Sequence, residues 1–315
     1  MGWRSSSGVG TCGPLLFLIY INDLRNAIYH STVHHFADDT NLLYTNKNLK
    51  TIQTKINKDL KSLCTWLRAN KISLNASKTE LIIFRDPRKK LTYSMKIKIN
   101  GKKLTPCSSV KYLGIYIDEH LNWNTHLAEL RPKLSRAVGM LSKIRYYVNE
   151  ETLRMVYFGI FSSIFSYGSL IWGQHNSISK KLQVFQNKAL RIMHFQPPRT
   201  SASPLLKLSN ILKFKDIINL QNFLYAHDSL KDNLPTALTG KMDFLDHTHE
   251  TRLITGNAQL AKPRSNTVLY GSKSIENRSI EVWNSINRNN HSVKFLEKSR
   301  VVCKMVIKKL LLSKY

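Results

Sequence analysis

The sequence has 315 residues and 42% of them are hydrophobic, which is enough for two or three domains and excludes a chain disordered by composition. It carries 48 lysines and arginines against 20 aspartates and glutamates, a net charge of +28. This excess indicates a polyanionic partner, either nucleic acid or an acidic membrane surface. The four cysteines form no CxxC pair, which argues against a zinc site or a disulfide framework and fits a reducing compartment.

The first third of the chain predicts a mixture of helix and strand. An apolar segment at 14–30 becomes amphipathic toward its end. Residues 33–44 alternate around an Asp-Asp pair, which predicts two short strands joined by a tight turn. Apolar residues then recur at helical spacing from Ile52 to Leu67, while the lysines fall largely off this stripe. We expect an amphipathic helix that ends at residue 69 and has a basic outer face.

Residues 72–118 predict further strands. The segment 72–84 predicts a strand, a turn and a second strand. Residues 95–104 alternate around Asn100-Gly101, which is a strong signal for a hairpin. Residues 110–118 predict one more strand.

From residue 121 the pattern is helical. Leu127, Leu130, Leu134, Val138 and Leu141 form one stripe. Residues 155–173 are uncharged over 19 positions, close to the length of a membrane span, but their serines and glycines favour a buried helix, and we expect no membrane.

The helical register continues after residue 175 and is followed by a polar loop at 196–204 and two further helical patches. From about 247 the chain is polar and irregular, and a basic helix is expected at 294–312.

The acidic pair Asp38-Asp39 is the first candidate for chemistry. Magnesium prefers hard oxygen ligands, commonly one or two carboxylates with water and phosphate, and adjacent carboxylates at a hairpin tip can both reach one ion. The alternative is an ordinary Asp-rich turn. For His34 and His35, which lie beside the pair, plain strand positions are favoured over acid–base roles.

Several motifs stand in a recognisable order. PLLFLIYINDL (14–24) precedes FADD (36–39), WLRANKISLNASKT (66–79) and VKYLGIYID (110–118). This series resembles the second half of the palm of reverse transcriptases from non-LTR retrotransposons, and the resemblance covers residues 7–175 well. It implies an α+β fold with a partial palm at 1–118, an antiparallel sheet with helices. A thumb-like helical domain at 119–175 and a basic, mostly helical C-terminal region at 176–315 would come after it.

The resemblance also implies roles for residues. Asp38 and Asp39 would be catalytic and bind Mg²⁺, with Asp38 the stronger ligand, and Lys78 would be a catalytic residue near the triphosphate of the incoming nucleotide. The alternative for Lys78 is a surface turn lysine, and Asn75 would shape that turn. The strand that supports the primer end would include Tyr112, Leu113 and Gly114, for which plain strand core is the alternative.

Two departures from the family pattern affect the expected activity. Where the family has a segment like GVPQGS, the chain reads SSSGVGTCGP (5–14). The family's first catalytic aspartate and its fingers lie upstream of this segment. We therefore expect a truncated reverse transcriptase that is inactive by itself.

The C-terminal region resembles the segment after the polymerase in such elements, through HTHETR (247–252), LYGSKSI (269–275) and VWNSI (282–286). His247 and His249 with nearby acids allow a metal site, although an exposed polar loop is favoured. An RNA template and a DNA primer or target are the expected partners, in an intracellular location, cytoplasmic or nuclear. The oligomeric state stays open. The alternatives are a non-catalytic RNA- or DNA-binding protein and a relic without present function.

Overall fold

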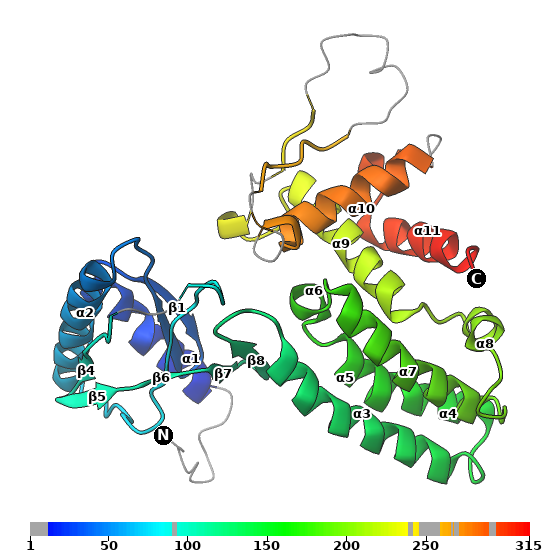
Figure 1. Ribbon diagram of the computed structural model, residues 1–315, viewed down its shortest axis with the longest axis horizontal. Coiled ribbons are helices and arrows are strands. Elements are labelled where there is room, and N and C mark those ends of the chain that lie inside the picture. The colour runs from blue at the N-terminus through cyan, green and yellow to red at the C-terminus, as the bar shows by residue number, and fades with distance from the viewer. Residues whose placement is uncertain are drawn as a thin grey trace. The chain divides into compact units, whose positions relative to one another are not determined.

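The computed structural model describes residues 12–89, 93–238, 242–245, 259–265, 267, 271–289 and 294–315, with only the backbone at Asn176 and Asn289. The chain divides into two compact units, Met1–Leu121 and Asn122–Tyr315. Figure 1 shows strands in the first unit and helices through the second. The α+β class is confirmed. The three predicted regions, 1–118, 119–175 and 176–315, stay a prediction.

The first unit is built around helix α2 (Leu49–Ala69), whose limits agree with the predicted helix. Asn48 begins it, because its side-chain oxygen accepts the backbone N–H of Lys50 at 2.9 Å. Leu60, Leu63 and Leu67 are buried, and they pack with the remaining core of this unit. The other elements are α1 (Cys12–Ile21), η1 (Asn22–Ala27), β1 (Thr32–Phe36), β2 (Asp39–Leu43), β3 (Leu81–Ile82), β4 (Ile97–Ile99), β5 (Lys102–Leu104), β6 (Pro106–Cys107), β7 (Ser109–Tyr112) and β8 (Ile115–Asp118).

The described strands pair two by two and do not form one continuous antiparallel sheet. The hairpins β1–β2, β4–β5 and β7–β8 are antiparallel, while β3 pairs with β6 in parallel. The hairpin β4–β5 turns at Asn100-Gly101 as predicted, and it packs on α2 through buried Ile97 and Ile99. The side-chain oxygens of Gln53 and Asn57 on α2 accept the backbone N–H groups of Lys96 and Lys98, at 2.6 and 3.0 Å.

Two predicted strands of this unit are wrong. Residues 72–75 form no strand, because Asn75 instead organises a turn, and only Leu81–Ile82 pairs beyond it. Residues 110–118 are not one strand, because Leu113 and Gly114 both have positive φ and reverse the chain between β7 and β8. A leucine at the first turn position gives no turn signal, which explains the error.

The second unit is helical, and its predicted stripe is confirmed: Leu127, Leu130, Leu134, Val138 and Leu141 are all buried. They lie on α3, which packs against α7. The helices of this unit are α3 (Asn124–Ile144), α4 (Glu150–Val156), η2 (Tyr157–Ser162), α5 (Ser163–Ser166), α6 (Ser169–Trp172), α7 (Asn176–Met193), α8 (Ala202–Leu208), α9 (Phe214–Leu230), η3 (Thr236–Leu238), α10 (Ile275–Asn289), η6 (Phe295–Glu297) and α11 (Arg300–Leu312).

The uncharged segment 155–173 forms a succession of short helical pieces, of which η2 is a π-helix. Its rings make a buried aromatic column: Tyr157 stacks on Phe161 at 5.2 Å, and Phe165 meets Phe214 of α9 at 4.5 Å. Within the described part of the chain, no helix combines the length and apolar character needed to cross a membrane.

A second core joins α9, α10 and α11. Phe223 of α9 stacks on Trp283 of α10 at 4.8 Å, and both side chains are buried. The expectation of irregular chain from 247 to 294 is therefore wrong over 275–289. This helix was hidden because polar side chains such as Asn277 and Ser279 lie on its buried face, where they reduce the apolar periodicity.

Candidate active site

The predicted acidic hairpin is present, and its turn consists of Ala37 and Asp38. Phe36 faces Asp39 as the last pair of β1 and β2, which leaves two residues to reverse the chain. Ala37 has φ 51°, a left-handed conformation that costs a non-glycine residue roughly 1–2 kcal/mol. Asp38 therefore lies at the tip itself, and Asp39 begins the returning strand.

The two faces of this hairpin differ in burial. Val33 and Leu42 face each other across the strands and pack on the core beneath α2. Because successive side chains alternate, Phe36 and Asp39 lie on the opposite face, where both are exposed. Within the described chain, no hydrogen bond or ion pair engages either carboxylate of Asp38 and Asp39. Both acids are thus open to a cation from solvent.

The chain before the hairpin is fixed by a buried carboxylate that the sequence did not reveal. Asp59 of α2 is 1% exposed and accepts backbone N–H groups from Tyr29, His30 and Ser31, at 2.7–3.2 Å. The Ser31 hydroxyl donates to the same carboxylate at 2.7 Å. An acid at an inward helical position, one residue before buried Leu60, is the signal that could have found it. Asp59 therefore fixes residues 29–31, which lead into β1.

The two histidines of β1 do not join the acids. His35 lies on the inward face, where its Nδ1 is 3.1 Å from the Thr40 hydroxyl. Burial, together with the charges of Arg25 and His34, lowers its pKa below 6.5, so the ring is neutral at neutral pH. His34 lies on the outward face opposite Asn41. The reading of His35 as a strand residue is confirmed.

Lys78 lies in a turn shaped by Asn75, as predicted. The Asn75 side chain accepts the backbone N–H and the hydroxyl of Ser77, at 3.1 and 2.6 Å. Its backbone carbonyl accepts the N–H of Lys78 at 3.1 Å. The Lys78 side chain is exposed. This geometry fits both a surface turn lysine and a lysine that binds a phosphate.

Tyr112, Leu113 and Gly114 form the turn of hairpin β7–β8. Tyr112 pairs with Ile115, and the two residues between them have φ 45° and 81°. The base of this hairpin is tied to the rest of the unit by an ion pair of Arg85 and Glu119 at 3.1 Å. A bulky residue with positive φ is uncommon and marks stored strain.

The candidate residues Asp38, Asp39, Lys78 and Tyr112–Gly114 all lie in the first unit. Among the described residues, no hydrogen bond or ion pair links Asp38 or Asp39 to Lys78 or to the β7–β8 turn, and no group of three or more His, Cys, Asp or Glu side chains could hold a metal ion. The donor set at the hairpin, two adjacent exposed carboxylates, suits Mg²⁺ together with water and phosphate oxygens. The segment SSSGVGT (5–11) and the histidine segment 247–252 lie outside the described residues.

Comparison with known proteins decides the family of this unit. Residues 10–117 match the family model "Reverse transcriptase (RNA-dependent DNA polymerase)", which includes the hairpin and the β7–β8 turn. Residues 10–117 belong to the reverse transcriptase family. The resemblance drawn from the motifs, a reverse transcriptase of a non-LTR retrotransposon, is confirmed.

The curated relatives of this reverse transcriptase segment are proteins of mobile elements. The chain is 29% identical to the probable RNA-directed DNA polymerase from transposon BS of Drosophila melanogaster over 68% of its own length and 25% of the relative's. It is 26% identical to the probable RNA-directed DNA polymerase from transposon X-element of the same fly, over 70% of its own length and 25% of the relative's. It is 22% identical to the RNA-directed DNA polymerase from mobile element jockey, also of this fly, over 73% of its own length and 26% of the relative's. The chain thus spans about a quarter of the length of these relatives. No solved structure matches it.

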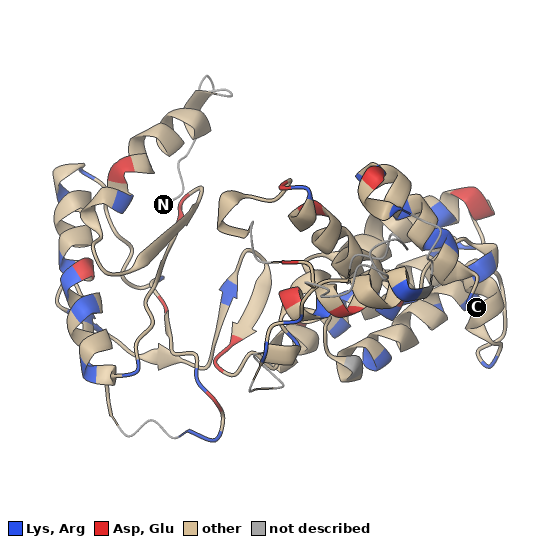
Figure 2. Ribbon diagram, turned by 90° about the horizontal axis from the view of Figure 1, so that it is seen from above, with Lys and Arg blue, Asp and Glu red and all other residues tan. Residues whose placement is uncertain are grey.

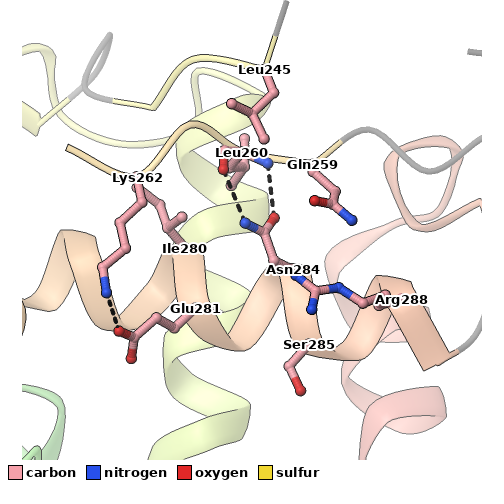
Figure 3. A pocket seen from close by; sticks show the side chains of 9 residues that line it. All are labelled: Leu245, Gln259, Leu260, Lys262, Ile280, Glu281, Asn284, Ser285 and Arg288. Atoms are coloured by element: carbon pink, nitrogen blue, oxygen red, sulfur yellow. Dashed lines mark hydrogen bonds and ion pairs between the residues drawn. The ribbon is translucent and has the colours of Figure 1, made fainter. Parts of the chain in front are cut away.

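A pocket in the second unit is separate from the reverse transcriptase residues. It lies between 259–262 and α10 (Figure 3), where the Asn284 amide donates to the carbonyl of Leu260 and accepts its N–H, at 2.9 and 2.8 Å. Lys262 pairs with Glu281 at its edge. These contacts hold an extended segment against the helix. None of the predicted site residues lines this pocket.

Proposed function

We propose that residues 12–118 carry the aspartate hairpin of a reverse transcriptase palm and that Asp38 and Asp39 bind Mg²⁺ during RNA-directed DNA synthesis. The observation that carries the proposal is the exposed, unpartnered carboxylate pair at a two-residue turn inside the matched segment. The substrates would be an RNA template, a DNA primer or target, and a nucleoside triphosphate.

The hairpin supplies what such a reaction requires from a protein. Phosphoryl transfer depends on positioning and on compensation of negative charge, and Mg²⁺ would supply that compensation when bound. Asp38 and Asp39 repel each other when free, and a cation relieves this repulsion. The inward packing of Val33 and Leu42 and the Asp59 contacts fix the backbone that presents the acids.

Two further segments would serve the same chemistry. The exposed ammonium of Lys78 is suited to a triphosphate, because it carries a mobile charge on a rigid turn. The turn at Leu113-Gly114 would support the primer end, since the glycine lets a nucleic-acid backbone approach closely. These roles rest on family resemblance and on the geometry of each turn.

We further infer that this chain does not synthesise DNA by itself. Among the described residues, no third acidic side chain groups with Asp38 and Asp39 to hold a metal ion. One carboxylate pair leaves a two-metal centre short of a ligand, and both ion affinity and geometry depend on the complete set.

A primer-extension assay tests this inference. The purified chain, with Mg²⁺, an annealed RNA template and DNA primer, and deoxynucleotides, should give no extended product. Synthesis that Asp38→Ala abolishes would overturn the inference of inactivity and would establish the hairpin as catalytic. Synthesis that survives Asp38→Ala would instead indicate a contaminating polymerase.

The second candidate function is nucleic-acid binding without synthesis. It is favoured by the outer face of α2, where Lys50, Lys58 and Lys61 are exposed. Figure 2 shows lysine and arginine positions, coloured blue on the ribbon, spaced along this helix. The predicted basic face is confirmed. Changing these three lysines to glutamine should weaken RNA and DNA binding and make the slope of log K against log salt less steep by up to ~3. Binding with an unchanged slope would exclude this face.

A further inference from the structure

Three large aromatic side chains are exposed at one end of the helical second unit. Tyr146 and Tyr147 follow α3 and are 67% and 87% exposed, and Phe195 follows α7 and is 55% exposed. The rings of Tyr146 and Phe195 meet edge to face, with centroids 5.9 Å apart. The guanidinium of Arg145 lies 4.5 Å from the Tyr146 ring and 5.2 Å from the Phe195 ring. We call these four residues the aromatic platform.

Hydrogen bonds fix the loop that carries Phe195 of the platform. The backbone N–H of Gln196 donates to the Arg191 carbonyl at 2.8 Å, and Arg191 Nε donates to the Thr200 carbonyl at 2.7 Å. These bonds fix the loop after α7. Phe195 has φ 51°, which a bulky residue adopts only when its surroundings impose it. The ring of Phe195 is therefore placed beside Tyr146 by the fold, at a cost in strain.

Arg145 gives the platform its charge. Within the described part of the chain, it has no acidic partner, and its Nε is buried without a hydrogen-bond partner. Its terminal nitrogen contacts the Tyr146 hydroxyl. The sequence of this unit, residues 122–315, has 29 basic and 12 acidic residues. An exposed aromatic surface with an uncompensated cation suits a ligand that is flat, apolar on its faces and negatively charged at its edge.

We propose that the aromatic platform binds single-stranded nucleic acid, with nucleobases stacked on Tyr146 and Phe195 and the phosphates beside Arg145. Bases of an unpaired strand offer their faces for stacking, whereas those of a duplex are already stacked on each other. RNA and DNA share this chemistry. The platform lies in the second unit, so the proposal stands apart from the metal chemistry of the hairpin.

Fluorescence anisotropy on the full chain tests the proposal. The probes are labelled oligothymidylate and oligouridylate of about a dozen nucleotides, and an abasic oligomer with the same phosphates. Tyr146→Ala with Phe195→Ala should weaken binding of a base-bearing oligomer about tenfold or more and leave abasic binding unchanged. Tyr146→Phe should retain binding, because the ring remains. If the double variant weakens binding of only the oligothymidylate or only the oligouridylate, the ligand of the platform is DNA or RNA, respectively.

The matched control is Tyr167→Ala, which removes another exposed tyrosine of the same unit. It should leave binding of every oligomer unchanged. An equal loss for the abasic oligomer, an equal loss in the control, or no loss in the double variant would each overturn the proposal. Sedimentation is compared for the two proteins: a wild-type dimer that becomes a monomer in the double variant, with unchanged oligonucleotide binding, would assign the platform to self-association instead.

Crosslinking keeps the test independent of how the variants fold. The wild-type chain is irradiated with an oligomer that contains 5-bromouracil, and the adducts are mapped by mass spectrometry. We expect adducts at Tyr146, Tyr147 or Phe195. Adducts confined to other tyrosines, such as Tyr167, would contradict the proposal.

Discussion

Leu113 and Asn100 open two hairpin turns with the same backbone, at φ 45° and 46°, and glycine follows each of them, Gly114 at φ 81° and Gly101 at φ 75°. Positive φ at both positions is the pattern of a type I′ turn. Asparagine tolerates it, whereas leucine is strained there by roughly 1–2 kcal/mol. Hairpin β7–β8 is therefore strained at Leu113, whereas β4–β5 is not. Backbone strain of this kind is found most often in functional segments.

Replacing Leu113 by asparagine should stabilise hairpin β7–β8, because the strain is removed. We expect hydrogen exchange over 109–118 to slow about fivefold, which corresponds to ~1 kcal/mol. The reciprocal change, Asn100→Leu, should speed exchange over 97–104 by a similar factor. Unchanged or faster exchange in Leu113→Asn would mean that contacts of the leucine side chain outweigh the strain.

Asp59→Ala should destabilise the first unit by about 1–3 kcal/mol or more, because three backbone N–H groups and a hydroxyl lose their acceptor. Urea unfolding measures this. Lys58→Ala is the control, since that neighbouring side chain is exposed and its loss should change stability by less than about 0.5 kcal/mol. Equal effects of the two changes would show that the Asp59 contacts contribute nothing specific.

Asp38→Asn and Asp39→Asn should separate metal binding from stability. Both side chains are exposed, so the free energy of unfolding should change by less than about 0.5 kcal/mol. Fe²⁺ replaces Mg²⁺ at oxygen sites and, with peroxide and ascorbate, cleaves the backbone nearby. The wild-type chain should be cut near residue 38 and both variants should not. Cleavage that persists in both variants would place the ion elsewhere.

His126 should make the second unit sensitive to acid. Burial, and secondarily the charge of Lys133, lowers its pKa from 6.5 to about 4, so the folded state excludes a proton that the unfolded chain binds. The contribution of the neutral ring is fully present above pH 6.5 and is lost as the pH falls from 6.5 toward 4. His126→Phe should therefore flatten the decline of the unfolding midpoint in this window, relative to its value at pH 8. Identical pH profiles for the two proteins would contradict this.

Local signals in the sequence predicted much of the fold. The stripe from Leu127 to Leu141 and the Asn100-Gly101 turn each carry their own periodicity or turn chemistry, and both were correct. The errors arose where tertiary contacts override local preference. Leu113 accepts a turn conformation that leucine avoids, and Ser279 is buried because its hydroxyl donates to Asn222 at 3.1 Å.

The candidate site was predictable only where its residues carry local sequence signals. Asp38 and Asp39 stand in a motif and at a turn, so their exposure follows from sequence. The inward position of Asp59 on its helix could be read from the sequence, but its backbone partners could not, because they lie about 30 residues earlier in the chain. The aromatic platform joins Tyr146 to Phe195, whose neighbourhood depends on how α3 and α7 pack.

Helix α1 presents an exposed apolar surface that affects binding measurements on this protein. Leu15, Leu16 and Ile19 are each at least 60% exposed, and only Ile21 of the helix is buried. A helix that is apolar on all sides is normally covered. At high protein concentration this surface would associate with itself, and anisotropy would then rise without any nucleic acid bound. Titrations are therefore best run at low concentration, with the sedimentation coefficient measured at each step.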